Sequence, residues 1–226
     1  MGKGVFITAT GTDTGKTYVT ALIVNKLKEA GYHAGYYKAA LSGAENIQES
    51  DAGYVKRTAG ISQADETLLS YLYESAVSPH LAARMEGNPV DIEKVKADYL
   101  RVCLEHDYVT VEGSGGIVCP IRWDDKKILL EDIIKALGLS VIIVADAGLG
   151  TINAVTLTAE YLKGRKIEAG GIILNHYHGG PMQEDNIKMI EDLTGISVLA
   201  CVKDDADELD IGLEELLSCY RGAGTV

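Results

Sequence analysis

Short, continuous hydrophobic runs alternate with amphipathic segments along the whole chain. Runs of this kind are typical of parallel strands that are covered on both faces. They predict strands at 5–9, 33–37, 108–111, 141–145, 171–174 and 198–202. Between them, hydrophobic positions recur with helical spacing. They predict a helix that contains 19–27 and ends at Gly31, a helix that contains 92–102 and follows Asp91, and helices at 131–137, 152–162, 183–193 and 213–220. This alternation predicts an α/β fold with a doubly wound, mostly parallel sheet flanked by helices, and we expect residues 1–226 to form a single domain.

The composition is that of an acidic globular protein. Hydrophobic residues make up 46% of the chain and charged residues 24%, which excludes a disordered chain. The 21 basic and 33 acidic residues give a net charge of −12. Such a charge provides no long-range attraction to nucleic acid or to anionic membranes, so neither is expected as a partner. Any polyanion that binds must therefore be held by a local cluster of donors.

The sequence also predicts a cellular compartment. The first residues show no secretory signal pattern, and the longest aliphatic run, 141–145, is far too short to span a bilayer. The four cysteines form no C-x-x-C pair and have no ligand-like spacing with histidine. This arrangement favours buried free thiols over disulfides or a metal centre. We therefore expect a cytoplasmic protein.

A phosphate-binding loop is predicted between the first strand and the first helix. Residues 9–17 read Ala-Thr-Gly-Thr-Asp-Thr-Gly-Lys-Thr, and the last three match the end of the P-loop motif in the required strand–loop–helix context. Gly15 would let the backbone approach phosphate oxygens at the helix N-terminus. Lys16 would contact the β- and γ-phosphates, and the Thr17 hydroxyl would ligate Mg²⁺. Thr10 replaces the first glycine of the motif, but the context still predicts a nucleoside-triphosphate site.

Further motifs follow this loop along the chain. They read YYKAALSG at 36–43, SDA at 50–52, SPHLAA at 78–83 with EG at 86–87, VEGSGG at 111–116 and LGTIN at 149–153. Together with the loop TATGTDTGKT at 8–17, these blocks resemble, in order and spacing, the dethiobiotin synthetases, a family of P-loop enzymes. The resemblance covers most of the chain to about residue 175 and is weak beyond it.

The resemblance implies an ATP- and Mg²⁺-dependent cyclo-ligase of biotin biosynthesis. Its substrates would be ATP, 7,8-diaminononanoate and CO₂. A carbamate formed on one amine would attack the γ-phosphate to give a carbamic–phosphoric mixed anhydride, and the second amine would then displace phosphate and close the ureido ring. The family resemblance further implies a homodimer in which the turn at 150–153 completes the neighbouring subunit's active site.

The resemblance also assigns residues to these roles. Catalytic roles would fall to Lys16, Lys38 and Thr12. The metal ligands would be Thr17, Asp51 and Glu112. The substrate would be bound by Ser42, Gly150, Thr151, Ile152 and Asn153. The nucleotide-binding residues would be Asp13, Thr14, Gly15, Lys16, Thr17, Tyr18, Asp51, Glu112, Gly113, Ser114, Gly115, Asn175 and His176, with Asn175 contacting adenine.

For two of these roles the residues by themselves favour a different interpretation from the resemblance. Lys38 is expected to end the second strand, where the residues by themselves favour a solvated lysine and the resemblance favours a contact to the transferred phosphoryl group. Asp146 follows five aliphatic residues and fits the strand-plus-Asp metal pattern better than Glu112 does. The resemblance makes Glu112 and Asp51 the metal ligands. Asp146 would then lie beyond the ligands and position them, or it would cap a helix.

The histidine-containing loop and the segment after the sixth strand carry less specific signals. His176 and His178 lack a third ligand and are expected to be loop residues. The family usually has a proline-containing turn after its sixth strand that helps to frame adenine, whereas residues 201–205 read Cys-Val-Lys-Asp-Asp. We therefore expect the base to be read loosely, with Asn175 as its one side-chain contact, and the role of residues 203–226 stays unassigned.

Two other functions use the same type of loop. A cobyrinate-type amide synthetase would normally carry a glutamine-hydrolysing domain, for which 226 residues leave no room. An ATPase switch of the partitioning type carries an extra lysine early in its P-loop, and this loop has none before Lys16. The sequence favours the ligase over both alternatives.

Overall fold

The computed structural model describes residues 1–222, so the last four residues of the predicted domain lie outside the described part. Its main sheet contains β1 Lys3–Ala9, β2 Ala34–Ser42, β3 Leu69–Tyr73, β4 Tyr108–Glu112, β7 Val141–Asp146, β8 Ala169–Asn175, β9 Val198–Cys201 and β10 Arg221–Gly222. The strand order is β3-β2-β4-β1-β7-β8-β9, all parallel, and β10 pairs antiparallel with β1. The predicted doubly wound, mostly parallel sheet is confirmed.

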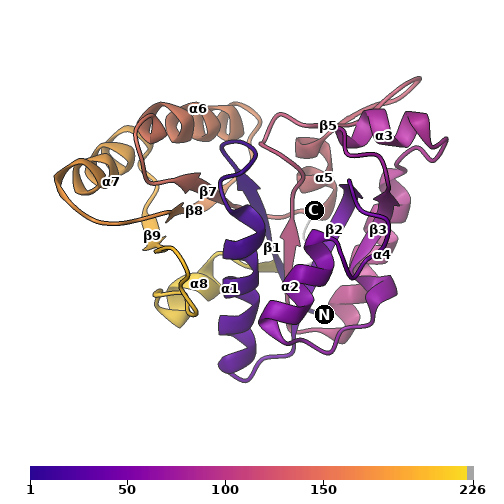
Figure 1. Ribbon diagram of the computed structural model, residues 1–226, viewed down its shortest axis with the longest axis horizontal. Coiled ribbons are helices and arrows are strands. Elements are labelled where there is room, and N and C mark those ends of the chain that lie inside the picture. The colour runs from indigo at the N-terminus through magenta and orange to yellow at the C-terminus, as the bar shows by residue number, and fades with distance from the viewer. Residues whose placement is uncertain (223–226) are drawn as a thin grey trace.

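Helices cover both faces of this sheet (Figure 1). They are α1 Lys16–Glu29, α2 Asp51–Ala59, α3 Pro79–Met85, α4 Ile92–Glu105, α5 Leu130–Leu137, α6 Thr151–Gly164, α7 Pro181–Thr194 and α8 Leu213–Ser218, with a 3₁₀ turn at Asp65–Thr67. Buried side chains of α1, α2 and α8 form the core on one face, and those of α3 to α7 form the core on the other. Coverage of both faces explains why the strands are continuous apolar runs.

Several short elements were not predicted. These are β3, β10, α2, α3 and a separate hairpin of β5 Pro120–Trp123 and β6 Lys127–Leu129. In α2 the helical pattern is obscured by Gly53, which is needed because a Cβ there would lie 2.2 Å from the Ile47 carbonyl oxygen. Ser50 begins this helix, and its Oγ accepts a hydrogen bond from the Gly53 N–H at 3.4 Å.

The second strand is longer than predicted, and the expectation that Lys38 ends it is wrong. β2 continues to Ser42 because the unpredicted β3 pairs with its second half, in a register that runs from Lys38 opposite Leu69 to Ser42 opposite Tyr73. Lys38 therefore lies inside a central strand and is only 3% exposed. A charge buried to this extent requires nearby partners of opposite charge.

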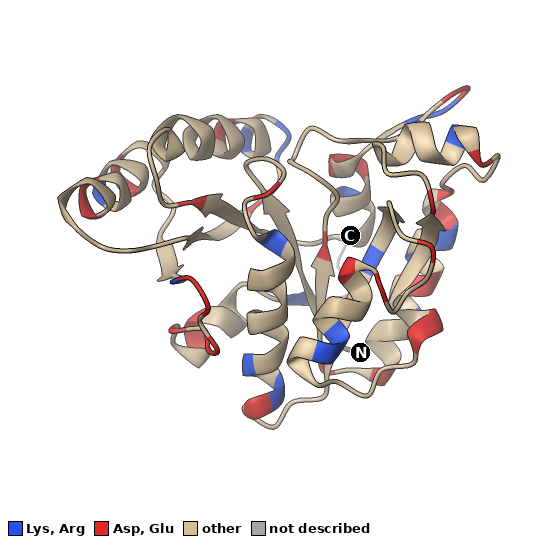
Figure 2. Cartoon of the chain, in the orientation of Figure 1, with Lys and Arg blue, Asp and Glu red and all other residues tan. Residues whose placement is uncertain are grey.

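The C-terminal part of the described chain folds back onto the sheet. The Tyr220 hydroxyl and Thr110 Oγ1 are 2.7 Å apart in the core, and Arg221 of β10 pairs with Gly4 of β1. Acidic side chains are spread over many elements, with a dense group in the loop that follows β9 (Figure 2). Within residues 1–222, no helix is long and apolar enough to cross a membrane.

Candidate active site

A cleft of about 740 Å³ lies at the carboxyl ends of β1, β2 and β4. This is the edge at which open α/β sheets hold their ligands. The cleft brings together most of the residues expected at the site, namely Thr12, Asp13, Thr14, Gly15, Lys16, Thr17, Lys38, Ser42, Asp51, Ser114 and Gly115. The cleft is also lined by residues 76–79 and 118–120, to which no role was assigned from the sequence.

The predicted P-loop connects β1 to α1 and leaves the first turn of the helix open to a ligand. Gly15 is the N-cap of α1, with φ of 76°, and no side chain caps that end. The first N–H groups of α1 therefore remain available to phosphate oxygens. A Cβ on Gly15 would lie 2.1 Å from Nδ2 of Asn175, which donates to the Thr14 carbonyl at 3.1 Å. Both the backbone conformation and this close contact thus require glycine.

Glu112 is the centre of an ion-pair cluster below the P-loop. Its Oε1 accepts hydrogen bonds from Lys16 Nζ at 3.0 Å, Thr17 Oγ1 at 2.8 Å and Lys38 Nζ at 3.0 Å. Burial by itself would raise the pKa of Glu112, but the positive charges of Lys38 and Lys16 outweigh it and lower the pKa to about 2. The carboxylate is therefore ionised at neutral pH.

Lys38 connects this cluster to the start of α2. Its Nζ also donates to Asp51 Oδ2 at 2.6 Å. Burial alone would lower the pKa of Lys38, yet Glu112 and Asp51 together more than offset it, so the pKa is raised and the ammonium stays charged. Two ammonium groups and two carboxylates balance one another, which avoids the large cost of an isolated buried charge.

Acid is expected to weaken the fold through Glu112. Its pKa in the folded chain, about 2, is below the ordinary value of 4.5, so the unfolded chain binds the proton more readily. The stabilisation is therefore complete above the ordinary pKa and is lost as the pH falls towards the folded-state pKa. Urea unfolding between neutral pH and about pH 3 measures this loss. Glu112→Gln should show a shallower pH dependence than the wild type, and equal slopes would contradict the assignment.

The oxygen ligands in this cluster suit a magnesium ion. The Thr17 hydroxyl and the Glu112 carboxylate are in contact, and Asp51 is joined to them through Lys38. Mg²⁺ is typically bound by one or two carboxylates together with phosphate oxygens and water. Across the described residues, no cluster of three or more His, Cys, Asp or Glu residues forms a complete metal site. The residues present thus fit a cation that is shared with a bound nucleotide.

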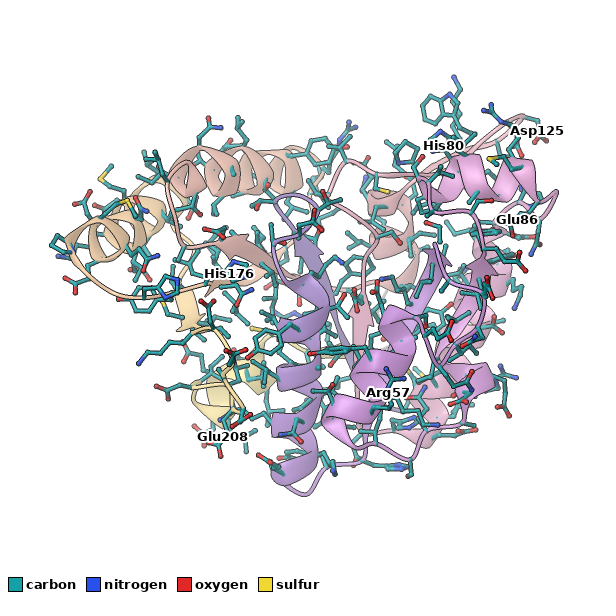
Figure 3. The ribbon with its side chains drawn as sticks, viewed as in Figure 1. Arg57, His80, Glu86, Asp125, His176 and Glu208 are labelled. Atoms are coloured by element: carbon teal, nitrogen blue, oxygen red, sulfur yellow. The ribbon has the colours of Figure 1, made fainter. Side chains whose placement is uncertain are left out.

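Asp146 lies apart from the Glu112 cluster. Its carboxylate accepts from the Gly148 N–H at 2.6 Å and lies 2.7 Å from Nδ1 of His176. It therefore supports the turn before α6, and His176 in turn lies 3.2 Å from the Asn175 amide. His176 lies on the other side of α1 from α2, which carries the labelled Arg57 (Figure 3).

The remaining expected site residues do not line the cleft. The Tyr18 hydroxyl donates to the Ala206 carbonyl, which attaches the loop after β9 to α1. Gly113 packs against β1, where a Cβ would lie 2.8 Å from the Phe6 ring. The turn with Gly150, Thr151, Ile152 and Asn153 begins α6, outside the residues that line this chain's cleft.

One contact of the cluster was not expected from the sequence. The Tyr36 hydroxyl donates to Glu112 Oε2 at 2.9 Å. A tyrosine within a strand resembles an ordinary core residue, and the period of two that places Tyr36 on the same face as Lys38 was the available signal.

The P-loop follows the carboxyl end of a central parallel strand, and its lysine donates to a buried carboxylate. These features place the chain among the P-loop enzymes that use nucleoside triphosphates. A family model described as an AAA domain matches residues 3–208. The chain is 51% identical over 212 residues to the ATP-dependent dethiobiotin synthetase BioD of Brachyspira hyodysenteriae, covering 93% of this chain and 96% of that protein. It is 49% identical over 225 residues to BioD of Clostridium botulinum strain Eklund 17B, covering 97% and 99%. The chain belongs to the ATP-dependent dethiobiotin synthetase family.

Family membership confirms the expected activity, an ATP-dependent carbon–nitrogen ligase of biotin biosynthesis, over the two alternatives. Solved structures with low sequence identity share the fold. A ParA family ATPase from Chlorobium tepidum has a TM-score of 0.58 at 15% identity, covering 97% of this chain and 90% of that chain. MinD from Pyrococcus horikoshii has a TM-score of 0.54 at 16% identity, covering 91% and 82%. These likenesses support the P-loop architecture and nothing more specific.

Proposed function

We propose that this chain closes the ureido ring of dethiobiotin by using ATP and Mg²⁺ to activate a carbamate of 7,8-diaminononanoate. The observation that carries the proposal is that Lys16 and Lys38, which both line the P-loop cleft, each donate to the same Glu112 oxygen at 3.0 Å. Two positive charges at this point suit a reaction in which negative charge develops on a transferred phosphoryl group.

The first chemical step needs positioning rather than a protein nucleophile. One substrate amine takes up CO₂, loses a proton and becomes a carbamate, and a carbamate oxygen then attacks the γ-phosphorus while ADP leaves. Lys16 and Lys38 would stabilise the charge that develops on the phosphoryl oxygens, with Thr12 beside them in the cleft. A Mg²⁺ ion bound by Thr17, Asp51 and Glu112 would supply further neutralisation of the phosphates.

The second step closes the ring. The other amine attacks the carbonyl carbon of the mixed anhydride, loses a proton, and phosphate leaves with the bridging oxygen. Ser42 is well placed to hold an amine, since it lines the cleft and its hydroxyl already donates to the Val77 carbonyl at 2.6 Å. Its oxygen lone pairs therefore remain to accept from a substrate N–H.

Isotope transfer tests this sequence of steps. With CO₂ or bicarbonate fully labelled in heavy oxygen, the released phosphate should carry one labelled oxygen per turnover, because the bridging oxygen comes from the carbamate. Mass analysis of the phosphate measures the transfer, with solvent exchange of the label followed in parallel. Unlabelled phosphate from labelled bicarbonate would rule out the mixed anhydride.

We propose further that the enzyme is a homodimer with a shared site. The turn at 150–153 opens α6 away from its own cleft, and residues beside it are exposed and apolar, with Leu149 94% and Leu157 63% exposed. Exposed apolar groups of this kind favour a protein interface. A helix N-terminus suits the carboxylate of a substrate held by the neighbouring subunit.

Mixed dimers test the shared site. Lys16→Ala chains and chains carrying Thr151→Ala with Asn153→Ala should each be nearly inactive, and mixing them should restore part of the activity. The recovery is expected because one of the two hybrid sites contains both intact halves. Subunit exchange is verified by mass spectrometry of differently tagged chains. If exchange is complete and activity stays at the level of the separate variants, the site is not shared.

The nucleotide base is expected to be read loosely. The Asn175 amide nitrogen is already bound to the Thr14 carbonyl, which leaves its oxygen as the free group, and the loop after β9 has no proline. A single side-chain contact discriminates weakly. We expect GTP and CTP to support turnover within about tenfold of ATP, a difference of ~1.4 kcal/mol. Comparison of kcat/KM for the four nucleotides decides this, and a preference for ATP above about a thousandfold would contradict it.

Two organisational proposals complete this account. We propose that residues 1–226 form one catalytic domain, supported by the single sheet that organises the helices of the described part. We also propose a cytoplasmic location, supported by the use of ATP and by four cysteines that are all free thiols.

A further inference from the structure

Tyr36 contacts the side of Glu112 that faces away from the P-loop. Its hydroxyl donates to Oε2 at 2.9 Å, whereas Lys16, Thr17 and Lys38 all bind Oε1. The Tyr36 side chain is completely buried. The two carboxylate oxygens therefore have different surroundings: Oε1 faces the nucleotide site, and Oε2 is hydrogen-bonded to a side chain of the core.

The backbone of Tyr36 is fixed by a buried side chain instead of a neighbouring strand. Pairing of β2 with β3 begins only at Lys38, so Tyr36 has no strand partner on that side. Gln63 takes that place: its Oε1 accepts from the Tyr36 N–H at 2.8 Å, and its Nε2 donates to the Tyr36 carbonyl at 2.9 Å. Two hydrogen bonds with Gln63 thus hold the Tyr36 backbone at the position where no residue of β3 pairs with it.

The Tyr36 hydroxyl can act only as a donor to Glu112. The Glu112 carboxylate accepts hydrogen bonds from two ammonium groups on its other oxygen, so in this contact the phenol O–H is the donor. Among the contacts of the described residues, no other donor reaches Oε2 of Glu112. Loss of this hydroxyl would leave a buried carboxylate oxygen without a partner, and the carboxylate would turn to find one.

We propose that Tyr36 is a positioning residue for the metal-binding carboxylate: its hydroxyl holds Glu112 so that Oε1 faces Thr17 and the cation of the bound nucleotide. The inference rests on the proposed function, since it assumes that Glu112 binds Mg²⁺. Hydrogen-bond partners of metal ligands typically contribute about 10–100-fold to metal affinity. We therefore expect Tyr36→Phe to raise the Mg²⁺ concentration needed for tight nucleotide binding by about tenfold or more.

Tyr37 provides a matched control on the same strand. Its side chain is equally buried, but it points to the other face, where its hydroxyl contacts Ser70 Oγ at 2.5 Å and the Val95 carbonyl at 3.1 Å. Tyr37→Phe removes the same atom from the core without touching Glu112. It should lower the melting temperature and leave the Mg²⁺ requirement unchanged.

The test is equilibrium binding of a non-hydrolysable ATP analogue across a series of Mg²⁺ concentrations, followed calorimetrically. The midpoint should shift for Tyr36→Phe and not for Tyr37→Phe, and turnover of Tyr36→Phe should recover in excess Mg²⁺. If Tyr36→Phe does not fold, Gln63→Met, which releases the backbone of Tyr36 and keeps its hydroxyl, should shift the midpoint in the same direction.

The outcomes separate the two claims. A midpoint for the folded Tyr36→Phe, or failing that for Gln63→Met, within twofold of the wild type would overturn the role of Tyr36 while the Mg²⁺ site stands. If the wild type itself binds the analogue equally well without Mg²⁺, the metal site of the proposed function is wrong, and the inference is overturned with it.

Discussion

Replacement of Lys38 by alanine is expected to lower turnover by about 10²–10³-fold, and Lys16→Ala should have a similar effect. Both ammonium groups lie 3.0 Å from Glu112 Oε1 beside the P-loop, where they can stabilise charge on the transferred phosphoryl group. Glu112 would keep three of its four donors in either variant, so the fold should survive. The measurement is kcat from phosphate release at saturating ATP, Mg²⁺, diamine and bicarbonate.

Lys56→Ala is the control for this prediction. Lys56 lies on α2 and forms an ion pair with Asp65, away from the residues that line the cleft. Its loss should leave kcat near the wild-type value, as expected for a surface ion pair. If Lys38→Ala fails to fold, Lys38→Met, which retains the aliphatic stem of the lysine, is measured in place of the alanine variant. Near-normal turnover of a folded Lys38 variant would show that this lysine does not act on the phosphoryl group.

Gly15→Ala is expected to weaken ATP binding by about 10²-fold and to destabilise the chain by ~1–3 kcal/mol. The new Cβ would lie 2.1 Å from Asn175 Nδ2, at a residue whose φ is 76°. Either the P-loop or Asn175 must move, and the contact between Asn175 and the Thr14 carbonyl would be lost. Affinity for the ATP analogue and the free energy of unfolding in urea measure the two effects.

Gly31→Ala separates backbone strain from this clash. Gly31 also has a positive φ, 86°, but a Cβ there would meet nothing within 4 Å. It should show only the cost of the left-handed conformation, ~1 kcal/mol, with unchanged nucleotide affinity. If the two variants lose stability equally and both keep their affinity, the packing of Gly15 against Asn175 has no role in the site.

The sequence predicts most of the parallel sheet, including the edge strand β9, and misses the strand β3 at the opposite edge. The continuous aliphatic run before Asp146 gives a clear strand signal, because that strand is covered on both faces. The edge strand Leu69–Tyr73 is partly exposed and short, and it has no such run. Since β3 holds the second half of β2 in the sheet, missing β3 also misplaced Lys38 at a strand end.

The candidate site was predictable where the chemistry is local in sequence. The loop that ends in Gly15, Lys16 and Thr17 carries its own motif, and the structure places it at a helix N-terminus. The contacts of Glu112 to residues on other elements depend on strand register. Lys38 lies directly opposite Glu112 in the β2–β4 pair, and Tyr36 lies two residues earlier on the same face. Such a register is set by tertiary packing and cannot be read from any single segment.

Phosphate release with each substrate left out in turn tests the central claim most directly. The account holds that the γ-phosphate is transferred to a carbamate, which requires both the diamine and CO₂ to be bound. We therefore predict that release from ATP is slow with either substrate alone and rises sharply when 7,8-diaminononanoate and bicarbonate are both present, with one dethiobiotin formed per phosphate. Phosphate release at the same rate without diamine and bicarbonate would contradict the account.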